Sequence, residues 1–345
     1  MINTLNDQKE IMESLQILAE LKGRAVSPEY HTVETVQEAV SLLERHGKDG
    51  VVFAGGTDIL SLMKNRILVP PVMINIKPVR KIDSISISAE STSIGTLTTI
   101  HDIMQSPLLK KRFPALVETA HAIASPIIRR MGTLGGNLCQ ETRCWYFRRS
   151  PETGISFDCR RKSENGRCYA VNGENQYHGI LDHSDCVGVC PSDMATVLLA
   201  LDAKIRTADS DGGRTLSMDE LYNSLGTTLH ENEMITFVDI PNVEPGTKQR
   251  FLKFRIRETI DYAIVSAAAI IKLKNDIIED ARIVLGGVSW KPYRALESEQ
   301  ILVGERISPD LAEKAANAAL AEARPLSKNS HKVEIAKALV KRVIL

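Results

Sequence analysis

The stretch Gly132-Thr133-Leu134-Gly135-Gly136-Asn137-Leu138-Cys139-Gln140-Glu141-Thr142-Arg143-Cys144 is the most informative part of the chain, because a glycine-rich loop runs directly into two cysteines. Glycine lets the backbone approach a bound group closely, and free N–H groups at the start of a helix attract an anion. Cysteine thiolates are nucleophiles and metal ligands. The stretch therefore joins a candidate anion-binding loop to a candidate metal site.

A similar loop lies upstream. Residues 50–54 (GVVFA) have the apolar pattern of a short strand, Gly55-Gly56-Thr57-Asp58 follows, and residues 59–64 (ILSLMK) have the pattern of a helix start. The loop is neither the Rossmann fingerprint nor a Walker A loop, and a plain strand-to-helix turn explains it equally well when it is taken alone. Two Gly-Gly-polar loops in one domain favour a dinucleotide gripped from two sides.

Downstream, all six cysteines fall between Cys139 and Cys190, a window of 52 residues, and the other 293 residues contain none. Thiols scattered through a core would not cluster in this way. A disulfide framework is typical of small secreted chains, and this chain is large. The cluster therefore indicates a metal or iron–sulfur site.

The spacing leaves the kind of site open. Zinc usually shows two tight Cys-x2–4-Cys pairs or histidines at short spacing, whereas here Cys159 and Cys168 stand alone between Cys139/Cys144 and Cys186/Cys190. Well-spread thiolates suit an iron–sulfur cluster. Zinc and unligated thiols remain alternatives at this point.

Composition narrows the function classes. The chain has 345 residues, with 43 Lys+Arg and 43 Asp+Glu, so its formal net charge is zero. Such a balance argues against binding to nucleic acid or to a membrane surface. No apolar run approaches the roughly 18 residues of a spanning helix, so no membrane insertion is expected. The length predicts two or three domains.

The first 22 residues carry six charges, which no signal peptide tolerates, so we expect a cytoplasmic protein unless a partner chain carries an export signal. Apolar residues recur there at helical spacing, and either an amphipathic helix or a solvated leader fits.

The C-terminal third has its own pattern. A turn at 209–213 predicts a hairpin, and 242–246 (NVEPG) reads as a linker. Beyond it we expect strands at 251–256, 263–273 and 277–285, and helices at 311–323 and 333–345. These elements predict an α+β tail of about 100 residues.

The segment 143–168 carries seven Lys/Arg against three acids. We expect a solvated surface with local charge compensation; the alternative is a docking face for an acidic electron carrier such as a ferredoxin.

Taken in order, these motifs resemble the FAD-binding (medium) subunit of the molybdenum hydroxylases, the xanthine dehydrogenase and carbon monoxide dehydrogenase group. The resemblance covers roughly residues 28–345. The motifs that carry it are Ala54-Gly55-Gly56-Thr57-Asp58-Ile59, Ile94-Gly95-Thr96-Leu97-Thr98-Thr99, residues 132–138, Ser192-Asp193, and Lys253-Phe254-Arg255-Ile256-Arg257 with Asp261-Tyr262.

The resemblance implies an α+β fold: a two-subdomain FAD-binding domain of the PCMH/VAO type, then a C-terminal domain like that of the CO dehydrogenase flavoprotein. The implied ranges are 1–27 for an N-terminal extension, 28–241 for the FAD-binding domain with a split near 80, about 139–190 for an iron–sulfur insert, and 247–345 for the C-terminal domain.

The insert is what sets this chain apart, because 54 residues separate Asn137 from Ser192 where most family members have few. The run GGNLCQETRC (135–144) resembles the β subunit of 4-hydroxybenzoyl-CoA reductase, whose insert carries a [4Fe–4S] cluster. The Pro191-Ser192-Asp193 ending resembles the FAD subunit of periplasmic aldehyde oxidoreductases, which carries a similar insert. The resemblance implies four cluster ligands, with Cys139 and Cys190 outside the set unless one replaces a ligand: Cys144, Cys159, Cys168 and Cys186.

For the flavin, the resemblance implies pyrophosphate contacts from two facing loops, one with Ala54, Gly55, Gly56, Thr57, Asp58 and Ile59, the other with Thr133, Gly136 and Asn137, beside Thr98. Asp193, next to Ser192, would accept a hydrogen bond from a ribose or adenine group. Lys253 would lie near the isoalloxazine edge and Ile235 would pack on the ring; a surface lysine and a core isoleucine are equally good explanations.

The implied function is electron relay between an external carrier such as ferredoxin and two partner chains, a molybdenum-cofactor large subunit and a [2Fe–2S] small subunit, in a heterohexamer. A 4-hydroxybenzoyl-CoA reductase-like enzyme is the first expectation, and an aldehyde oxidoreductase or xanthine dehydrogenase-like hydroxylase is the alternative. Two other classes remain, a self-contained flavin oxidase and a zinc-stapled nucleotide-binding module. No acid–base or nucleophile constellation is evident, and His178 and His183 are expected on the surface.

Overall fold

The computed structural model describes residues 28–150 and 154–345, and the helix expected at 1–22 lies outside them.

The first unit is a small parallel sheet of strand order β1-β3-β2. Helix α2 is capped by Thr35, which accepts from the Glu38 N–H, and it packs Ala39, Val40 and Leu43 on the sheet. The elements are β1 (Glu29–Thr32), α2 (Val36–His46), β2 (Gly50–Phe53), α3 (Ile59–Lys64) and β3 (Val72–Asn75).

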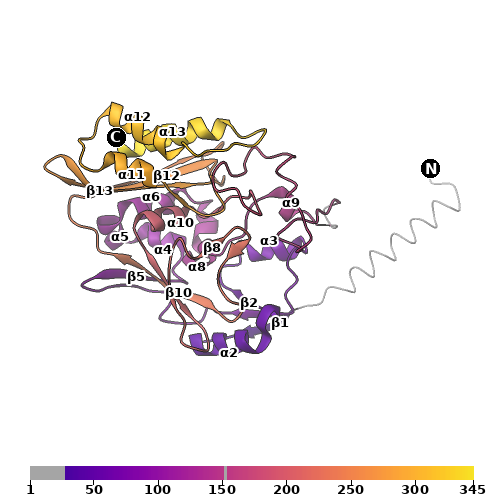
Figure 1. Ribbon diagram of the computed structural model, residues 1–345. Coiled ribbons are helices and arrows are strands. Elements are labelled where there is room, and N and C mark those ends of the chain that lie inside the picture. Colours follow the sequence, from indigo (N-terminus) through magenta and orange to yellow (C-terminus); the bar gives the residue numbers. More distant parts are fainter. Residues whose placement is uncertain (1–27, 151–153) are drawn as a thin grey trace, which may run out of the picture.

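The second unit is a five-stranded antiparallel sheet of order β4-β5-β10-β6-β7, with a group of helices above it in Figure 1. The hairpin expected around 209–213 is confirmed, because β6 and β7 pair antiparallel on either side of that turn. The strands are β4 (Ile85–Ile87), β5 (Ser91–Gly95), β6 (Lys204–Ala208), β7 (Thr215–Ser217), β10 (Met234–Pro241) and the separate pair β8 (Tyr222–Asn223) and β9 (Gly226–Thr227).

The helices of this unit form a middle layer. Helix α10 is buried along its whole length, which explains the continuous apolar run after Ser192. The helices are α4 (Ile100–Gln105), α5 (Pro107–Arg112), α6 (Pro114–Ala122), α7 (Pro126–Met131), α8 (Leu134–Leu138), α9 (Trp145–Arg148) and α10 (Asp193–Ala200).

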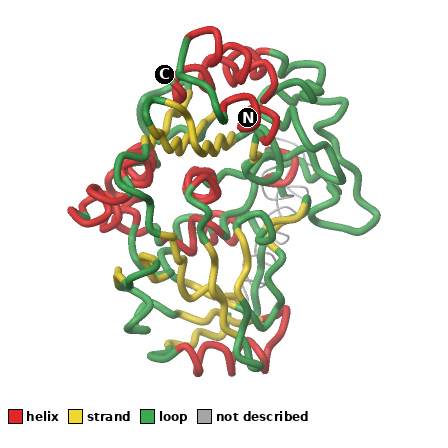
Figure 2. Tube along the Cα trace, turned by 60° about the vertical axis from the view of Figure 1, so that its left-hand side comes forward, coloured by secondary structure: helices red, strands yellow, loops and turns green. Residues whose placement is uncertain are grey.

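The C-terminal unit is a four-stranded antiparallel sheet between two helix layers, with α11 and α13 on one face and α6 and α10 on the other (Figures 1 and 2). Strand β12 is apolar on both faces: Ala267 and Ala269 enter the C-terminal core, while Ala268 and Ile270 enter the middle core. The elements are β11 (Lys248–Phe254), β12 (Val265–Lys274), β13 (Ile277–Gly286), β14 (Tyr293–Arg294), α11 (Leu296–Leu302), α12 (Pro309–Ala319) and α13 (His331–Ile344).

These three units confirm the predicted α+β class. The strands and helices expected in the C-terminal third are all present, with ends that differ by a few residues.

In the cysteine segment, residues 139–190, the described parts 139–150 and 154–190 have little regular structure beyond α9 and lie at one side of the molecule (Figure 1). It is tied to the start of α13. The Lys332 ammonium donates to the His178 carbonyl at 2.8 Å, and the Asn329 amide donates to the Gly179 carbonyl at 3.0 Å. Within the described residues, no helix is long and apolar enough to cross a membrane.

Candidate functional site

The two glycine loops meet backbone to backbone. A Cβ added to Gly55 would lie 1.9 Å from the Met131 carbonyl oxygen, which is main chain and cannot yield, so only glycine permits this approach. Gly56 has a φ of +73°, which also favours glycine. In the part of the chain that the structure describes, the N–H groups of Gly56, Thr57 and Asp58 donate to no other group. They are therefore available to a bound anion.

The second loop is anchored on the segment that follows β5. The Gly135 N–H donates to the Thr96 carbonyl, and the Leu134 N–H donates to the Thr98 carbonyl. Thr133 caps α8 by accepting from the Gly136 N–H at 3.2 Å. The Thr98 hydroxyl is buried and has no hydrogen-bond partner among the described residues. A buried hydroxyl without a partner is costly, and a bound ligand would satisfy it.

Both loops line one groove of about 360 Å³, which we call the glycine groove. It contains Ala54, Gly55, Gly56, Thr57, Asp58 and Ile59 from the first loop, Thr133 and Gly136 from the second, and Ile235 from β10. The structure thus brings together residues that are 180 positions apart in the sequence. The volume of the glycine groove is within the range of small-molecule and cofactor sites.

Asn137 and Ser192 are also brought together, although the whole insert separates them. The Ser192 hydroxyl donates to the Asn137 side-chain oxygen at 2.7 Å and also caps α10. The insert is therefore a loop that leaves and re-enters the domain at one point.

Lys253 and Asp193 form a buried ion pair at 2.7 Å, with side chains 4% and 7% exposed. Lys253 also donates to the Ala122 carbonyl at 3.2 Å. The roles expected for them, adenine or ribose for Asp193 and the isoalloxazine edge for Lys253, stay predictions, and the structure adds that the two side chains are in direct contact. Ile235, expected to pack on the ring, lines the glycine groove.

The Asp58 carboxylate contacts the insert. It accepts from the Glu141 N–H at 2.8 Å, from Arg148 at 2.8 Å, and from Arg143. At 143–168 the expected charge compensation is present, but the expected solvation is wrong for three of the seven cations, whose side chains are only 25%, 13% and 7% exposed in their ion pairs: Arg143, Arg148 and Arg161. Partial burial makes unpaired charge costly, so acids on other segments neutralise these arginines.

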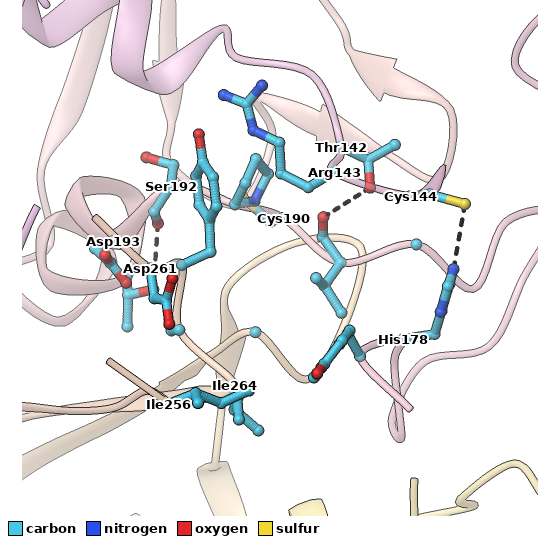
Figure 3. A pocket seen from close by; sticks show the side chains of 18 of the residues that line it. Thr142, Arg143, Cys144, His178, Cys190, Ser192, Asp193, Ile256, Asp261 and Ile264 are labelled. Carbon is cyan, nitrogen blue, oxygen red and sulfur yellow. Dashed lines mark hydrogen bonds between the residues drawn. The ribbon is translucent and has the colours of Figure 1, made fainter. Parts of the chain in front are cut away.

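A second groove, the interdomain groove, lies between the insert and the C-terminal unit and measures about 480 Å³ (Figure 3). Its wall includes Thr142 and Arg143, which follow directly on Gln140 and Glu141 of the glycine groove. Ser192 and Asp193 form another part of the wall, and Tyr262 stacks on the Arg143 guanidinium at 4.7 Å. The two grooves are therefore neighbours along the strip 139–143.

The four cysteines implied as cluster ligands line one small cavity, the cysteine cavity: Cys144, Cys159, Cys168 and Cys186. Phe147 and Tyr169 close it. Cys139 lies in the glycine groove and Cys190 in the interdomain groove, so neither faces this cavity. Across the described ranges, no three His, Cys, Asp or Glu side chains converge closely enough for a single metal ion.

Polar groups contact these sulfurs from buried positions. Arg161 Nε lies 3.4 Å from Cys186 Sγ, and the Gly188 N–H donates to the same sulfur at 3.2 Å. Burial raises the pKa of the Cys144 thiol to about 12, so without a metal or cluster this thiol stays protonated.

His178 is not on the surface as expected. It is 4% exposed and its Nε2 lies 3.2 Å from Cys144 Sγ. Burial, reinforced by the nearby Lys332 charge, lowers the pKa of His178 to about 4. His183, by contrast, is exposed as expected. Sequence reasoning missed both His178 and Arg161, because neither has a motif; only their position among the cysteines hinted at a role.

The family comparisons agree with this geometry. Residues 24–243 match the FAD binding domain in molybdopterin dehydrogenase, and residues 250–345 match the CO dehydrogenase flavoprotein C-terminal domain. The aldehyde oxidoreductase FAD-binding subunit PaoB of Escherichia coli is 30% identical, over 91% of this chain and 96% of its own. The glyceraldehyde dehydrogenase medium chain of Sulfolobus acidocaldarius is 28% identical, over 86% of this chain and 89% of its own.

Solved structures of similar proteins also match this chain along most of its length. Carbon monoxide dehydrogenase from Hydrogenophaga pseudoflava has a chain that matches with a TM-score of 0.73 at 25% identity, covering 91% of this chain and 95% of that one. Quinoline 2-oxidoreductase from Pseudomonas putida 86 matches with a TM-score of 0.72 at 25% identity, covering 92% and 95%.

Proposed function

This chain belongs to the family of FAD-binding subunits of molybdopterin dehydrogenases, and on that premise we propose that it holds a [4Fe–4S] cluster beside its FAD and relays electrons between them in a molybdenum hydroxylase. The observation that supports the cluster is the convergence of four cysteines from one segment on a cavity beside the interdomain groove. FAD supplies hydride and single-electron chemistry when it is bound, and the protein positions it and sets its potential.

The chain's own groups suit a dinucleotide. Three free N–H groups, those of Gly56, Thr57 and Asp58, would hold the pyrophosphate, with the Thr98 hydroxyl as a further donor. The two grooves are neighbours along residues 139–143, so an elongated ligand could use both. Asp58 contributes its N–H here, while its carboxylate holds the insert against the loop.

The cysteine arrangement suits a cluster better than zinc. A single zinc ion needs four ligands that converge at about 2.3 Å from one point. A cubane spreads its four thiolates over four irons, so its ligands surround a volume. Four thiols that line a cavity, with no single-ion set among the described residues, match the second pattern.

The relatives favour the aldehyde oxidoreductase-like alternative over the 4-hydroxybenzoyl-CoA reductase-like reading. Their names include an aldehyde oxidoreductase, a glyceraldehyde dehydrogenase and carbon monoxide dehydrogenases. The run GGNLCQETRC remains the one argument for the reductase. In either case the substrate would bind a partner molybdenum subunit, and a [2Fe–2S] subunit would link it to this chain.

Several finer points stay proposals. They are the domain boundaries at 28, 241 and 247, the heterohexamer, and ferredoxin as the external carrier. The burial of Arg143, Arg148 and Arg161 leaves fewer free cations for an acidic carrier than the sequence suggests.

The test is anaerobic purification of the chain, followed by iron, sulfide and flavin analysis and EPR of the reduced protein. We expect one FAD and about four irons per chain, with a cubane signal. Cys159→Ser should lose the signal, and Cys139→Ser, a matched change outside the cavity, should keep it. Zinc in place of iron would refute the cluster and leave the flavin subunit intact.

A further inference from the structure

Cys144 differs from the other three cysteines of the cysteine cavity in one respect: it also lines the interdomain groove. Cys159, Cys168 and Cys186 line only the cavity. Cys144 lies directly before α9, whose first residue, Trp145, is in the groove wall as well. Among the four sulfurs, that of Cys144 is therefore the one shared between the two sites.

His178 stands beside this shared sulfur. Its Nε2 lies 3.2 Å from Cys144 Sγ, and Figure 3 shows the ring in the groove wall with this contact as a dashed line. The other ring nitrogen, Nδ1, is buried without a hydrogen-bond partner among the described residues. Because Nδ1 has no acceptor, the tautomer with its proton on Nε2 is the one whose N–H is satisfied, and that N–H points at sulfur.

The position of this ring is set by the C-terminal unit. The His178 carbonyl accepts from Lys332 at 2.8 Å and from the Asn329 amide at 3.2 Å. Lys332 is fully buried and also donates to the carbonyl of Gly287, another residue of the groove. Trp145 packs edge-on against the imidazole with centroids 5.9 Å apart. Such support is typical of an imidazole whose orientation matters to a metal site.

Resting on the proposed function, we propose that Cys144 is the ligand through which the cluster faces the interdomain groove. We propose also that His178 is the positioning residue that holds this sulfur and raises the cluster's reduction potential by donating Nε2–H to it. A hydrogen bond to a ligand sulfur stabilises the more negative, reduced cluster, so potentials rise with such bonds. The site already carries other donors of this kind, Arg161 and the Gly188 N–H at Cys186.

The experiment is an EPR-monitored redox titration of the anaerobically purified chain. His178→Phe removes the N–H and keeps an aromatic ring, and it should lower the equilibrium constant for one-electron reduction of the cluster about tenfold, which is 59 mV for n = 1. His178→Gln keeps an N–H donor, so its reduction potential should lie close to that of the wild type. His183→Phe, on the same segment but exposed and in contact with the Gly179 carbonyl, should leave the potential at the wild-type value.

The outcomes separate the two proposals. A wild-type chain without iron refutes the proposed function, and this inference with it. An iron-loaded wild type with an unchanged potential in His178→Phe refutes the inference alone.

If His178→Phe does not load iron, pulsed EPR of the wild type with ¹⁵N-histidine decides. A weak ¹⁵N coupling, kept in His183→Phe, supports the hydrogen bond to sulfur. No coupling, or a strong one from direct ligation to iron, overturns it.

Discussion

The Lys253–Asp193 ion pair joins the C-terminal sheet to the start of α10, and breaking it should be expensive. The two side chains are 4% and 7% exposed and lie 2.7 Å apart, so each would be left as a buried, unpaired charge without the other. Removing one partner of such a pair costs about 3–5 kcal/mol. For Lys253→Met we expect the smaller cost, about 3 kcal/mol, because the N-terminus of α10 stabilises the remaining Asp193 carboxylate by about 0.3–1 kcal/mol.

The double variant Lys253→Met/Asp193→Asn should cost much less than the sum of the single changes, since no unpaired charge remains. We expect a coupling energy of about 2–3 kcal/mol. At about 2.1 cal/mol/K per residue, 345 residues give an unfolding entropy of about 0.7 kcal/mol/K, so each single change should lower Tm by about 4–7 °C.

The assay is urea and thermal unfolding of the wild type, both single variants and the double variant. Lys337→Met, which removes a surface lysine 3.9 Å from Glu334, is the control and should cost about 0.3–0.5 kcal/mol. Strictly additive losses in the double variant would show that the pair contributes nothing, and the reasoning from burial would fail.

Three further predictions concern residues that line the glycine groove. Gly55→Ala should lower FAD content at least about tenfold, because the new Cβ meets the Met131 carbonyl at 1.9 Å; wild-type flavin absorbance in this variant would contradict the loop contact. Asp58→Asn should destabilise the chain by about 2–3 kcal/mol in urea unfolding by weakening the acceptor of two half-buried arginines, whereas exposed Asp219→Asn should cost at most about 1 kcal/mol. For Glu233, burial would raise the pKa, but hydrogen bonds led by that from Arg214 lower it to about 2. Its stabilising effect should therefore be present above about pH 4.5 and disappear as pH falls toward about 2, so the wild type and Glu233→Gln should differ in unfolding free energy at pH 7 and converge at low pH; a constant difference would contradict this.

Much of the fold could be read from the residues, because it depends on local pattern. The alternation that sends Ala267 and Ala268 to opposite faces of β12 makes an apolar strand, and such a strand must be covered on both sides. The turn at 209–213 and the Pro at the start of α12 act within a few residues. Elements built from such signals were predicted to within a few positions.

The site was predictable only where chemistry is tied to a residue type. Glycine at position 55 and six clustered cysteines point to close backbone approach and to thiolate ligation in any fold. The ion-pair partner of a charged residue is different, because nothing in the local sequence indicates which opposite charge it will contact after folding. The pairing of Asp193 with Lys253, across 60 positions, could not be predicted for that reason.

The sequence by itself therefore determined the α+β class, the two glycine loops and the thiol-rich insert, since each depends on residue type and short-range spacing. Only the tertiary structure decided which cysteines share a cavity, that His178 lies against Cys144, and that three arginines of the insert are largely buried in ion pairs. Those facts depend on burial and on contacts between distant segments, and both exist only after the insert has packed against α3 and the C-terminal unit.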